Sequence, residues 1–296
     1  MKKCILFRLF LSVILILSIF LIAGCSNKIT QATIIDSKDA GAKIVVAVTI
    51  VPEQTFVEAV CGDLAQVVTM VPPGSSPENY EPSPQEMILL SEASVYFSIG
   101  VPTEMANILP QIGDIPLVSL QDEVAAVYPD RTFKSGERDP HIWLSPKRVE
   151  IMIEVIVKEM CSIDEVNADT YTQNGAEYIA QLEKADKEIS ETLKNVDSKK
   201  FIVYHPAFGY FADDYGLEMY ALEEEGKEAT VGRLEDMIDL AKEENIKVIF
   251  YQEEIDSSQA EAFAQEIGGV TEQLAPLSAD YINNLNKIAD TFAETL

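Results

Sequence analysis

The stretch DEVNADTYTQNGAEYIAQLEKADKEISETLKN, residues 164–195, carries a single apolar stripe on an otherwise polar background. Its apolar residues follow one another at intervals of three, four or seven residues, which predicts one amphipathic helix. These residues are Tyr171, Tyr178, Leu182, Ala185, Ile189 and Leu193. Gly175 weakens this helix without ending it. At a rise of 1.5 Å per residue, ~30 residues extend ~45 Å, which exceeds the diameter of a small domain. We therefore expect a long rigid helix that joins two bodies.

On both sides of this helix, apolar strands alternate with helical segments, which is typical of parallel sheets. The predicted strands are 43–49, 66–71, 94–99, 116–120, 201–204, 217–220, 247–251 and 270–274. The predicted helices are 52–60, 85–91, 103–109, 147–161, 231–244, 258–267 and 279–294. The sequence therefore predicts an α/β fold with an N-terminal lobe at 43–163, a linking helix at 164–196, a C-terminal lobe at 197–296 and a ligand cleft between the lobes.

The first 24 residues have the pattern of a signal peptide. Three basic residues and no acidic residue precede the apolar run Leu9–Ala23. This run has 15 residues, fewer than the ~20 that a helix needs to span a membrane. Leu21–Cys25 resembles a bacterial lipobox, in which the cysteine is lipidated and cleavage occurs before it. An uncleaved anchor and an ordinary cleavage near Gly24 are the alternatives. We expect an extracytoplasmic protein anchored to the bacterial cell membrane through Cys25, with residues 25–42 as a polar tether.

Two further cysteines, Cys61 and Cys161, lie in the mature chain. Export permits a disulfide between them. Each also lies on an apolar helical stretch, where a free cysteine behaves as a small hydrophobic residue. The sequence leaves both states open.

The chain is strongly acidic, with 49 Asp and Glu against 22 Lys and Arg and a formal net charge of −27. Loss of residues 1–24 would remove three bases and make the charge −30. Such a surface repels phosphate backbones, so we expect no nucleic-acid partner. The sequence also shows no nucleophile motif, phosphate-binding glycine loop or CxxC pair, and we expect no enzyme.

The only two histidines lie where a parallel sheet places its ligands. His205 directly follows the strand 201–204, and His141 lies beyond the last strand of the first lobe. A lone loop histidine is usually structural, but here both lie at the edge of the expected cleft. The proline-rich loop 71–84 lies at the matching position after the second strand, and its acids are Glu78 and Glu81. Two imidazoles and a carboxylate suit Zn²⁺, and each added carboxylate favours Mn²⁺.

These segments together resemble the metal-binding lipoproteins of bacterial zinc and manganese ABC importers. The similarity covers roughly residues 43–296 and depends on PPGSSPENYEPSP, DPHIWLSP, YHPAFGYFADDYGL and the long helix. The resemblance implies two α/β lobes bridged by one helix with the metal between them, His141 and His205 as ligands, and an ABC permease as partner. We expect a monomer that binds the metal ion as its transported ligand.

The chain departs from that family at several positions. Glu78 stands where the family usually carries a histidine ligand, and no histidine-rich loop precedes His141. The neighbourhood 274–277 has no acid where manganese-binding members offer a late aspartate. Gln252 stands where many relatives have glutamate. Glu254 or water is then the candidate for a fourth ligand, although Glu253 and Glu254 also suit a solvated loop.

The sequence therefore predicts a lipoprotein that captures a divalent transition metal for an ABC importer; zinc is favoured over manganese, but the sequence does not decide between them. A binding protein of the same fold for a non-metal solute and a surface adhesion protein are the alternatives. Other features favour structural roles: Trp143 is expected to pack its loop, and Phe208, Tyr210 and Phe211 to fill the second lobe. The run 223–228 is expected to be a solvated loop, with the edge of the cleft as the alternative.

Overall fold

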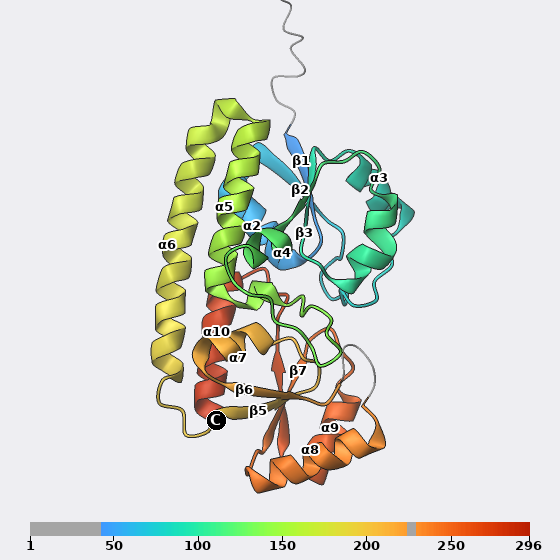
Figure 1. Cartoon of the computed structure of the whole chain (residues 1–296), viewed down its shortest axis with the longest axis vertical. Helices are drawn as coiled ribbons and strands as arrows, with labels where there is room; N and C mark the ends of the chain where they lie inside the picture. Colours follow the sequence, from blue (N-terminus) through green and yellow to red (C-terminus); the bar gives the residue numbers. More distant parts are fainter. Residues whose placement is uncertain (1–42, 224–228) are drawn as a thin grey trace, which may run out of the picture. The chain divides into compact units, whose positions relative to one another are not determined.

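The computed structural model describes residues 43–223 and 229–296, and the predicted signal peptide and tether lie outside this range. Within it, strands and helices alternate on both sides of one long helix, as predicted (Figure 1). Each lobe contains a four-stranded parallel sheet flanked by helices. The predicted α/β fold of two lobes joined by one long helix is confirmed.

The first lobe is built around a sheet with the strand order β2-β1-β3-β4. The central strand β1 pairs with β2 from Ile44 opposite Ala65 and with β3 from Val46 opposite Val95, all in parallel. A strand with neighbours on both sides and helices on both faces must be apolar, which explains its composition. The elements of this lobe are β1 (Ile44–Val48), α2 (Val51–Cys61), β2 (Ala65–Thr69), α3 (Pro84–Ser91), β3 (Val95–Ser98), η2 (Glu104–Ile108), β4 (Leu117–Ser119), α4 (Leu120–Ala125) and α5 (Pro146–Ile163).

The second lobe repeats this topology, with the strand order β6-β5-β7-β8. Both strands with the weaker sequence pattern, 217–220 and 270–274, are present as β6 and β8. The elements are β5 (Lys200–Val203), α7 (Gly209–Tyr215), β6 (Glu218–Ala221), α8 (Val231–Glu243), β7 (Val248–Gln252), α9 (Ser258–Glu266), β8 (Val270–Leu274) and α10 (Tyr281–Thr295).

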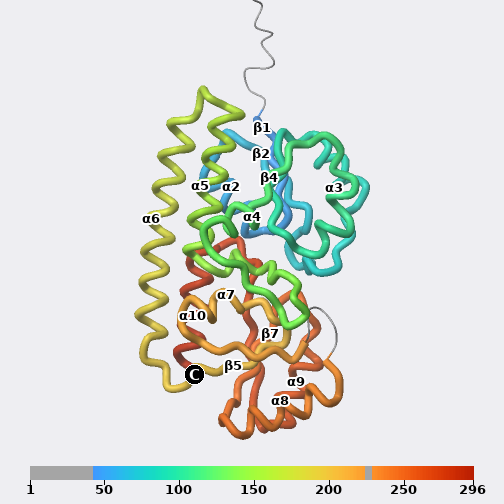
Figure 2. The backbone as a smooth tube through the Cα atoms, viewed as in Figure 1, coloured from blue at the N-terminus to red at the C-terminus, as the bar shows by residue number. Residues whose placement is uncertain are grey.

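The long helix α6 (Ala168–Leu193) packs beside α5 and α10, and so contacts helices of both lobes (Figures 1 and 2). All six residues of the predicted apolar stripe are buried. Gly175 has a packing role, because a Cβ there would lie 2.4 Å from the Val157 side chain of α5. The helix begins later than predicted, since Asp164 accepts hydrogen bonds from Asn167 and Tyr171 and forms a separate turn before it.

Two helices lack a clear sequence signal. The pattern did not predict α4, which has six residues, or α7, which has seven and follows the segment His205–Phe208. Both are too short for amphipathic periodicity to identify them. The neighbouring aromatic residues Phe208, Tyr210 and Phe211 are buried in the core, as predicted.

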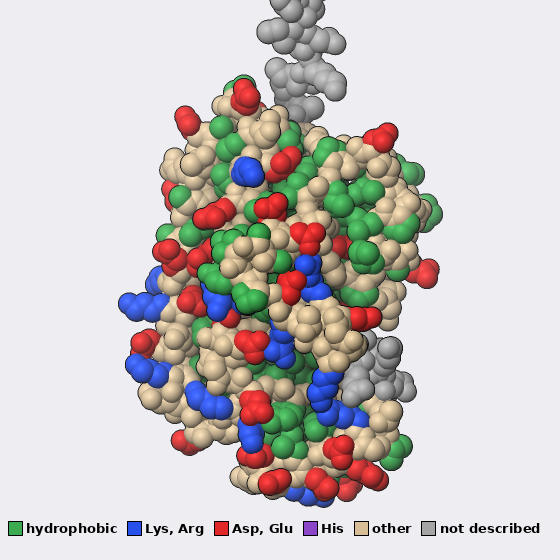
Figure 3. Space-filling view, viewed as in Figure 1, with side chains coloured by type: hydrophobic (Ala, Val, Ile, Leu, Met, Phe, Trp, Pro, Cys, Tyr) green, Lys and Arg blue, Asp and Glu red, His purple; other side chains and the backbone are tan. Residues whose placement is uncertain are grey.

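Cys61 is buried, Cys161 is half-buried, and both are free, so the structure contains no disulfide between them. Among the described residues, no helix is both long and apolar enough to cross a membrane. Acidic side chains are spread over the face shown in Figure 3, with Lys and Arg side chains among them.

Candidate metal centre

Three loops bring Glu78, His141 and His205 together. Glu78 lies on the loop between β2 and α3, and His205 lies two residues beyond the end of β5. His141 precedes the short helical turn that leads into α5. The parallel strands of each sheet direct their carboxyl ends toward this edge, which explains why residues from both lobes meet here.

The proline-rich loop is fastened to the segment that follows β3. The Thr103 backbone N–H donates to the Pro77 carbonyl at 3.1 Å, and the Thr103 hydroxyl and the Asn107 amide both donate to the Tyr80 carbonyl. These bonds flank Glu78 on both sides. They hold its side chain, which is 20% exposed, against the two histidines.

The side-chain donors of the three residues converge on one point. The Nε2 atoms of His141 and His205 lie 3.2 Å apart. Glu78 Oε1 lies 3.8 Å from the first of these atoms and 3.6 Å from the second. Among the residues the structure describes, this is the one group of three or more potential metal ligands whose donor atoms lie within 4.8 Å of one another. The structure therefore brings together the three residues that the sequence singled out.

A carboxylate orients each imidazole. His141 Nδ1 lies 2.7 Å from Asp139 Oδ1, and His205 Nδ1 lies 2.6 Å from Glu223 Oε2. Each Nδ1–H therefore donates to a carboxylate, and each Nε2 faces the shared centre. Such carboxylate–histidine pairs are the usual support of metal-binding imidazoles.

The charged groups of the cluster shift one another's pKa values. Burial by itself would lower the pKa of His205, but the hydrogen bond to Glu223 and the negative charges of Glu78 and Glu223 outweigh it and raise this pKa to about 9. Burial would likewise raise the pKa of Glu78, but the neighbouring His205 and His141 lower it below its ordinary value. At neutral pH the metal-free cluster therefore holds a carboxylate and a protonated imidazole, and a metal ion must displace that proton.

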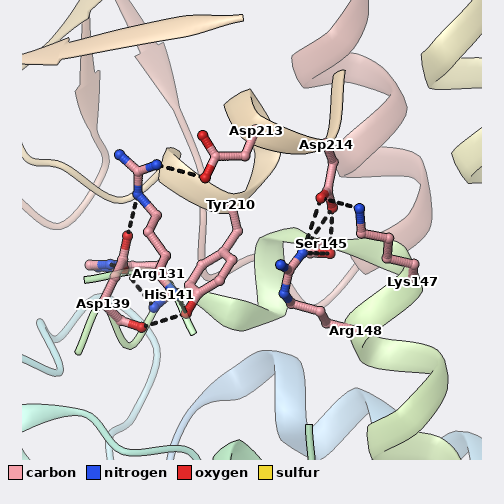
Figure 4. A network of polar contacts seen from close by, with 9 residues as sticks. All are labelled: Arg131, Asp139, His141, Ser145, Lys147, Arg148, Tyr210, Asp213 and Asp214. Atoms are coloured by element: carbon pink, nitrogen blue, oxygen red, sulfur yellow. Dashed lines mark hydrogen bonds and ion pairs between the residues drawn. The ribbon is translucent and has the colours of Figure 1, made fainter. Parts of the chain in front are cut away.

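Asp139 connects His141 to the second lobe (Figure 4). Its carboxylate is fully buried, accepts from the His141 backbone N–H at 3.0 Å and lies 3.2 Å from Arg131 Nε. Arg131 also forms an ion pair with Asp213 of α7 at 2.7 Å. Gly209 makes room for this arginine, because a Cβ at that position would lie 2.2 Å from Arg131 Nε.

The structure does not place Glu254 in the cluster. Its carboxyl group is half-buried, and burial raises its pKa, with Glu253 adding to the shift and His205 opposing it. Its assignment as a fourth ligand stays a prediction. Glu81 is exposed on the proline-rich loop, outside the group of converging donors.

Trp143 packs its loop as predicted. It is buried, its ring lies 5.1 Å from that of His141, and its indole N–H donates to the Pro276 carbonyl at 2.9 Å. The segment 274–277 therefore contacts this tryptophan through its backbone.

Sequence reasoning missed the two orienting carboxylates. Asp139 lies only two residues before His141, and this spacing permits its bond to the His141 backbone N–H. Glu223 belongs to the acidic run that was expected to be a solvated loop. For Glu223 that expectation is wrong, because it lies two residues beyond the end of β6 and binds His205. Residues 224–228 lie outside the described range.

The donor set fits a divalent transition metal. Two imidazole nitrogens and one carboxylate oxygen suit Zn²⁺, and the carboxylate also suits Mn²⁺ or Fe²⁺. Glu78 Oε1 is buried and has no hydrogen-bond partner in the described structure. A buried carboxylate oxygen without a donor is unfavourable, and a cation at the centre of this cluster would satisfy it.

Comparison with known proteins identifies the family. A model described as zinc-uptake complex component A, periplasmic (ZnuA), matches residues 46–295. The chain belongs to the ZnuA family. Relatives in this family include the high-affinity zinc uptake system protein ZnuA of Bacillus subtilis, which is 30% identical over 276 residues covering 87% of this chain and 85% of the relative.

Other relatives extend the range of metals. The iron ABC transporter substrate-binding lipoprotein MtsA of Streptococcus pyogenes is 27% identical over 85% of this chain and 84% of its own. A crystal structure of a ZnuA protein superposes with a TM-score of 0.80 at 35% identity, covering 86% of this chain and 99% of that protein. The ZnuA-family match confirms the resemblance inferred from the sequence motifs.

Proposed function

We propose that this protein is an extracytoplasmic binding protein that captures a divalent transition metal and delivers it to the permease of an ABC importer. Membership of the ZnuA family supports this proposal. The observation that carries it is the convergence of Glu78, His141 and His205, with Glu78 Oε1 buried and without a hydrogen-bond donor. The protein performs no chemistry on the metal.

The three ligands come from both lobes. Glu78 and His141 lie on loops of the first lobe, and His205 follows β5 of the second. A metal bound by all three links the lobes directly. Zinc is the proposed cargo, because two imidazoles dominate the donor set, and the carboxylate keeps manganese as the competitor.

Competitive zinc and manganese titrations test this assignment. Glu78→Ala removes one donor and should weaken binding of both metals by roughly 10-fold or more. Glu78→His replaces an anionic oxygen by a neutral nitrogen and should raise zinc affinity relative to manganese by roughly tenfold. Glu81→Ala is the matched control, since Glu81 is exposed on the same loop.

The titrations also address the alternatives. Unchanged affinities in both Glu78 variants would remove Glu78 from the site. Failure of the parent protein to bind one equivalent of either metal would favour the non-metal solute. The adhesion role stays a prediction that needs a separate ligand assay.

The proposal includes a lipid anchor at Cys25. The motif Leu21–Cys25 supports it, and residues 25–42 would tether the binding body to the membrane. Cys25→Ser should shift the protein from the detergent phase to the aqueous phase on detergent partitioning. Equal partitioning of parent and variant would contradict lipidation.

A further inference from the structure

A cavity of about 530 Å³ opens directly onto the metal cluster. Glu78, His141 and His205 all line it, so it meets every donor at the centre. Since one water molecule takes ~30 Å³ in the liquid, a metal ion with a few water ligands would leave most of this cavity unused. Its size instead lies within the ~300–1,000 Å³ of small-molecule sites.

The three protein donors leave the metal coordination sphere incomplete. Zn²⁺ takes at least four ligands, and Mn²⁺ prefers about six. The other sides of the histidines are closed, because carboxylates bind their Nδ1 atoms and Trp143 lies against His141. The cavity therefore leaves a side from which additional donors can enter.

The charges around the cavity select the kind of donor. Glu78 offsets one of the two positive charges of the metal, and Glu223, which binds His205, places a further negative charge beside it. Arg138 lines the cavity but is held by Asp122 and Asp130, at 2.8 Å each, which offset its charge. Glu137 adds a negative charge to the wall. These carboxylates favour a chelator of low charge and disfavour a trianion such as citrate.

The rest of the wall is apolar. Pro102, Met105 and Phe133 line the cavity together with the metal ligands. Met105 is 65% exposed although it is large and hydrophobic. This wall suits a chelator that carries an apolar side chain next to its donor atoms.

We propose that the cavity accepts an α-amino acid that binds the metal through its amino nitrogen and one carboxylate oxygen, so that the cargo is a metal–amino acid complex. This inference rests on the proposed metal-binding function. The amino acid enters as a zwitterion, its ammonium group releases one proton to solvent, and it binds the metal as a monoanion. Its side chain lies against Met105 and Phe133.

Zinc binding at buffered free zinc, with and without millimolar L-methionine, tests the proposal. A ternary complex lowers the free zinc concentration at half-saturation, and we expect a fall of about fivefold or more, the lower end of usual coupling between two ligands. Glycine, which has the chelating atoms and no side chain, should have a smaller effect, and citrate none. Native mass spectrometry should show protein, one zinc ion and one L-methionine in the same species.

Two variants separate the cavity from the metal ligands. Met105→Trp fills the cavity from an exposed position, and should keep the affinity for zinc alone while abolishing the L-methionine effect. Ile88→Trp is the matched control, because Ile88 is 61% exposed on α3 of the same lobe and does not line the cavity. Parent and control should behave alike.

The outcomes distinguish this inference from the proposed function. If zinc binds but its half-saturation at buffered free zinc is unaffected by L-methionine, the inference is wrong and the metal-binding function stands. An L-methionine effect that survives in Met105→Trp would also overturn the cavity assignment. If zinc alone does not bind, both proposals fail.

Discussion

The surroundings of His141 and His205 differ although both imidazoles meet the same centre. Asp139 orients His141, and its carboxylate is fully buried and paired with Arg131, which in turn reaches Asp213 of the other lobe. Glu223 orients His205 from two residues beyond the end of β6, where its side chain is 13% exposed. The first histidine is therefore part of an interlobe network, whereas the second depends on one carboxylate near the surface. We therefore expect the groups around His141 to affect both the stability of the fold and the position of this ligand. We expect Glu223 to affect mainly the protonation of His205, which competes with metal binding.

The largest expected effect concerns pH. Because the pKa of His205 is raised to about 9, a metal ion must displace one proton from it at neutral pH. Metal affinity should therefore rise by about 50-fold between pH 7 and pH 9, because half of the His205 side chains are already unprotonated at pH 9. Glu223→Gln removes the charge of the carboxylate whose hydrogen bond is the largest single contribution that raises this pKa, and should reduce the rise to about tenfold. Zinc titrations at several pH values measure both profiles, with Glu218→Gln on β6 as control; parallel profiles for parent and Glu223→Gln would contradict the assignment.

The same pKa predicts the stability of the metal-free protein. A folded-state pKa above the ordinary value of ~6.5 stabilises the folded protein fully below pH ~6.5, and this contribution is lost as the pH rises through about 9. The loss amounts to about 3 kcal/mol. Urea denaturation of metal-free protein at pH 6, 7.5 and 9 would measure it, and a free energy of unfolding that rises over this range would contradict the prediction.

The next effect compares the two orienting carboxylates. Asp139→Ala and Glu223→Ala should each lower zinc affinity by about 10- to 100-fold at pH 9, where proton competition is weak. At pH 9, where the contribution of the protonated His205 to stability is mostly lost, only Asp139→Ala should also lower the free energy of unfolding, by about 3 kcal/mol, because it removes a buried partner of Arg131. Titration and urea denaturation of both variants separate these effects. An equal loss of unfolding free energy in the two variants would contradict the proposed difference between the surroundings of His141 and His205.

A smaller effect is expected from the two arginines that pair with α7 (Figure 4). Arg131 pairs with Asp213 and also with Asp139, which orients His141. Arg148 pairs with Asp214 at 3.0 Å and forms no ion pair with Asp139. Arg131→Met should lower zinc affinity by about tenfold. Arg148→Met should leave zinc affinity unchanged while lowering the free energy of unfolding by about 2 kcal/mol, since Lys147 still pairs with Asp214. A loss of affinity in Arg148→Met would show that lobe contacts in general, and not the link to Asp139, support the site.

The smallest effect is expected at Glu254. It lies outside the group of converging donors, although His205 affects its pKa. Glu254→Gln should therefore change zinc affinity by about twofold at most, which competitive titration can resolve. A loss of tenfold or more would support Glu254 as the fourth ligand and weaken the case for a ligand that enters from the cavity.

Most of the fold could be predicted from the sequence, because the signals are local and repeated. Apolar runs such as KIVVAVT, 43–49, predict strands buried on both faces, and the stripe on 164–195 predicts the long helix. The short helices α4 and α7 escaped prediction because six or seven residues cannot show a helical period. The packing role of Gly175 is also visible only in the structure, because the side chain that leaves no room for a Cβ there is Val157 on another helix.

For the site, the sequence by itself determined the donor types: the two histidines of the chain, and a carboxylate on the proline-rich loop at a matching strand end. Strand order then decided that these residues meet, because parallel strands direct their carboxyl ends to one edge. Only the tertiary structure decided which groups orient them. Glu223 is 18 residues from His205 and looks like any exposed acid in the sequence, and Arg131 reaches Asp213 across 82 residues. Hydrogen bonds and ion pairs depend on distances of about 3 Å between side chains, and the packing of two lobes sets those distances.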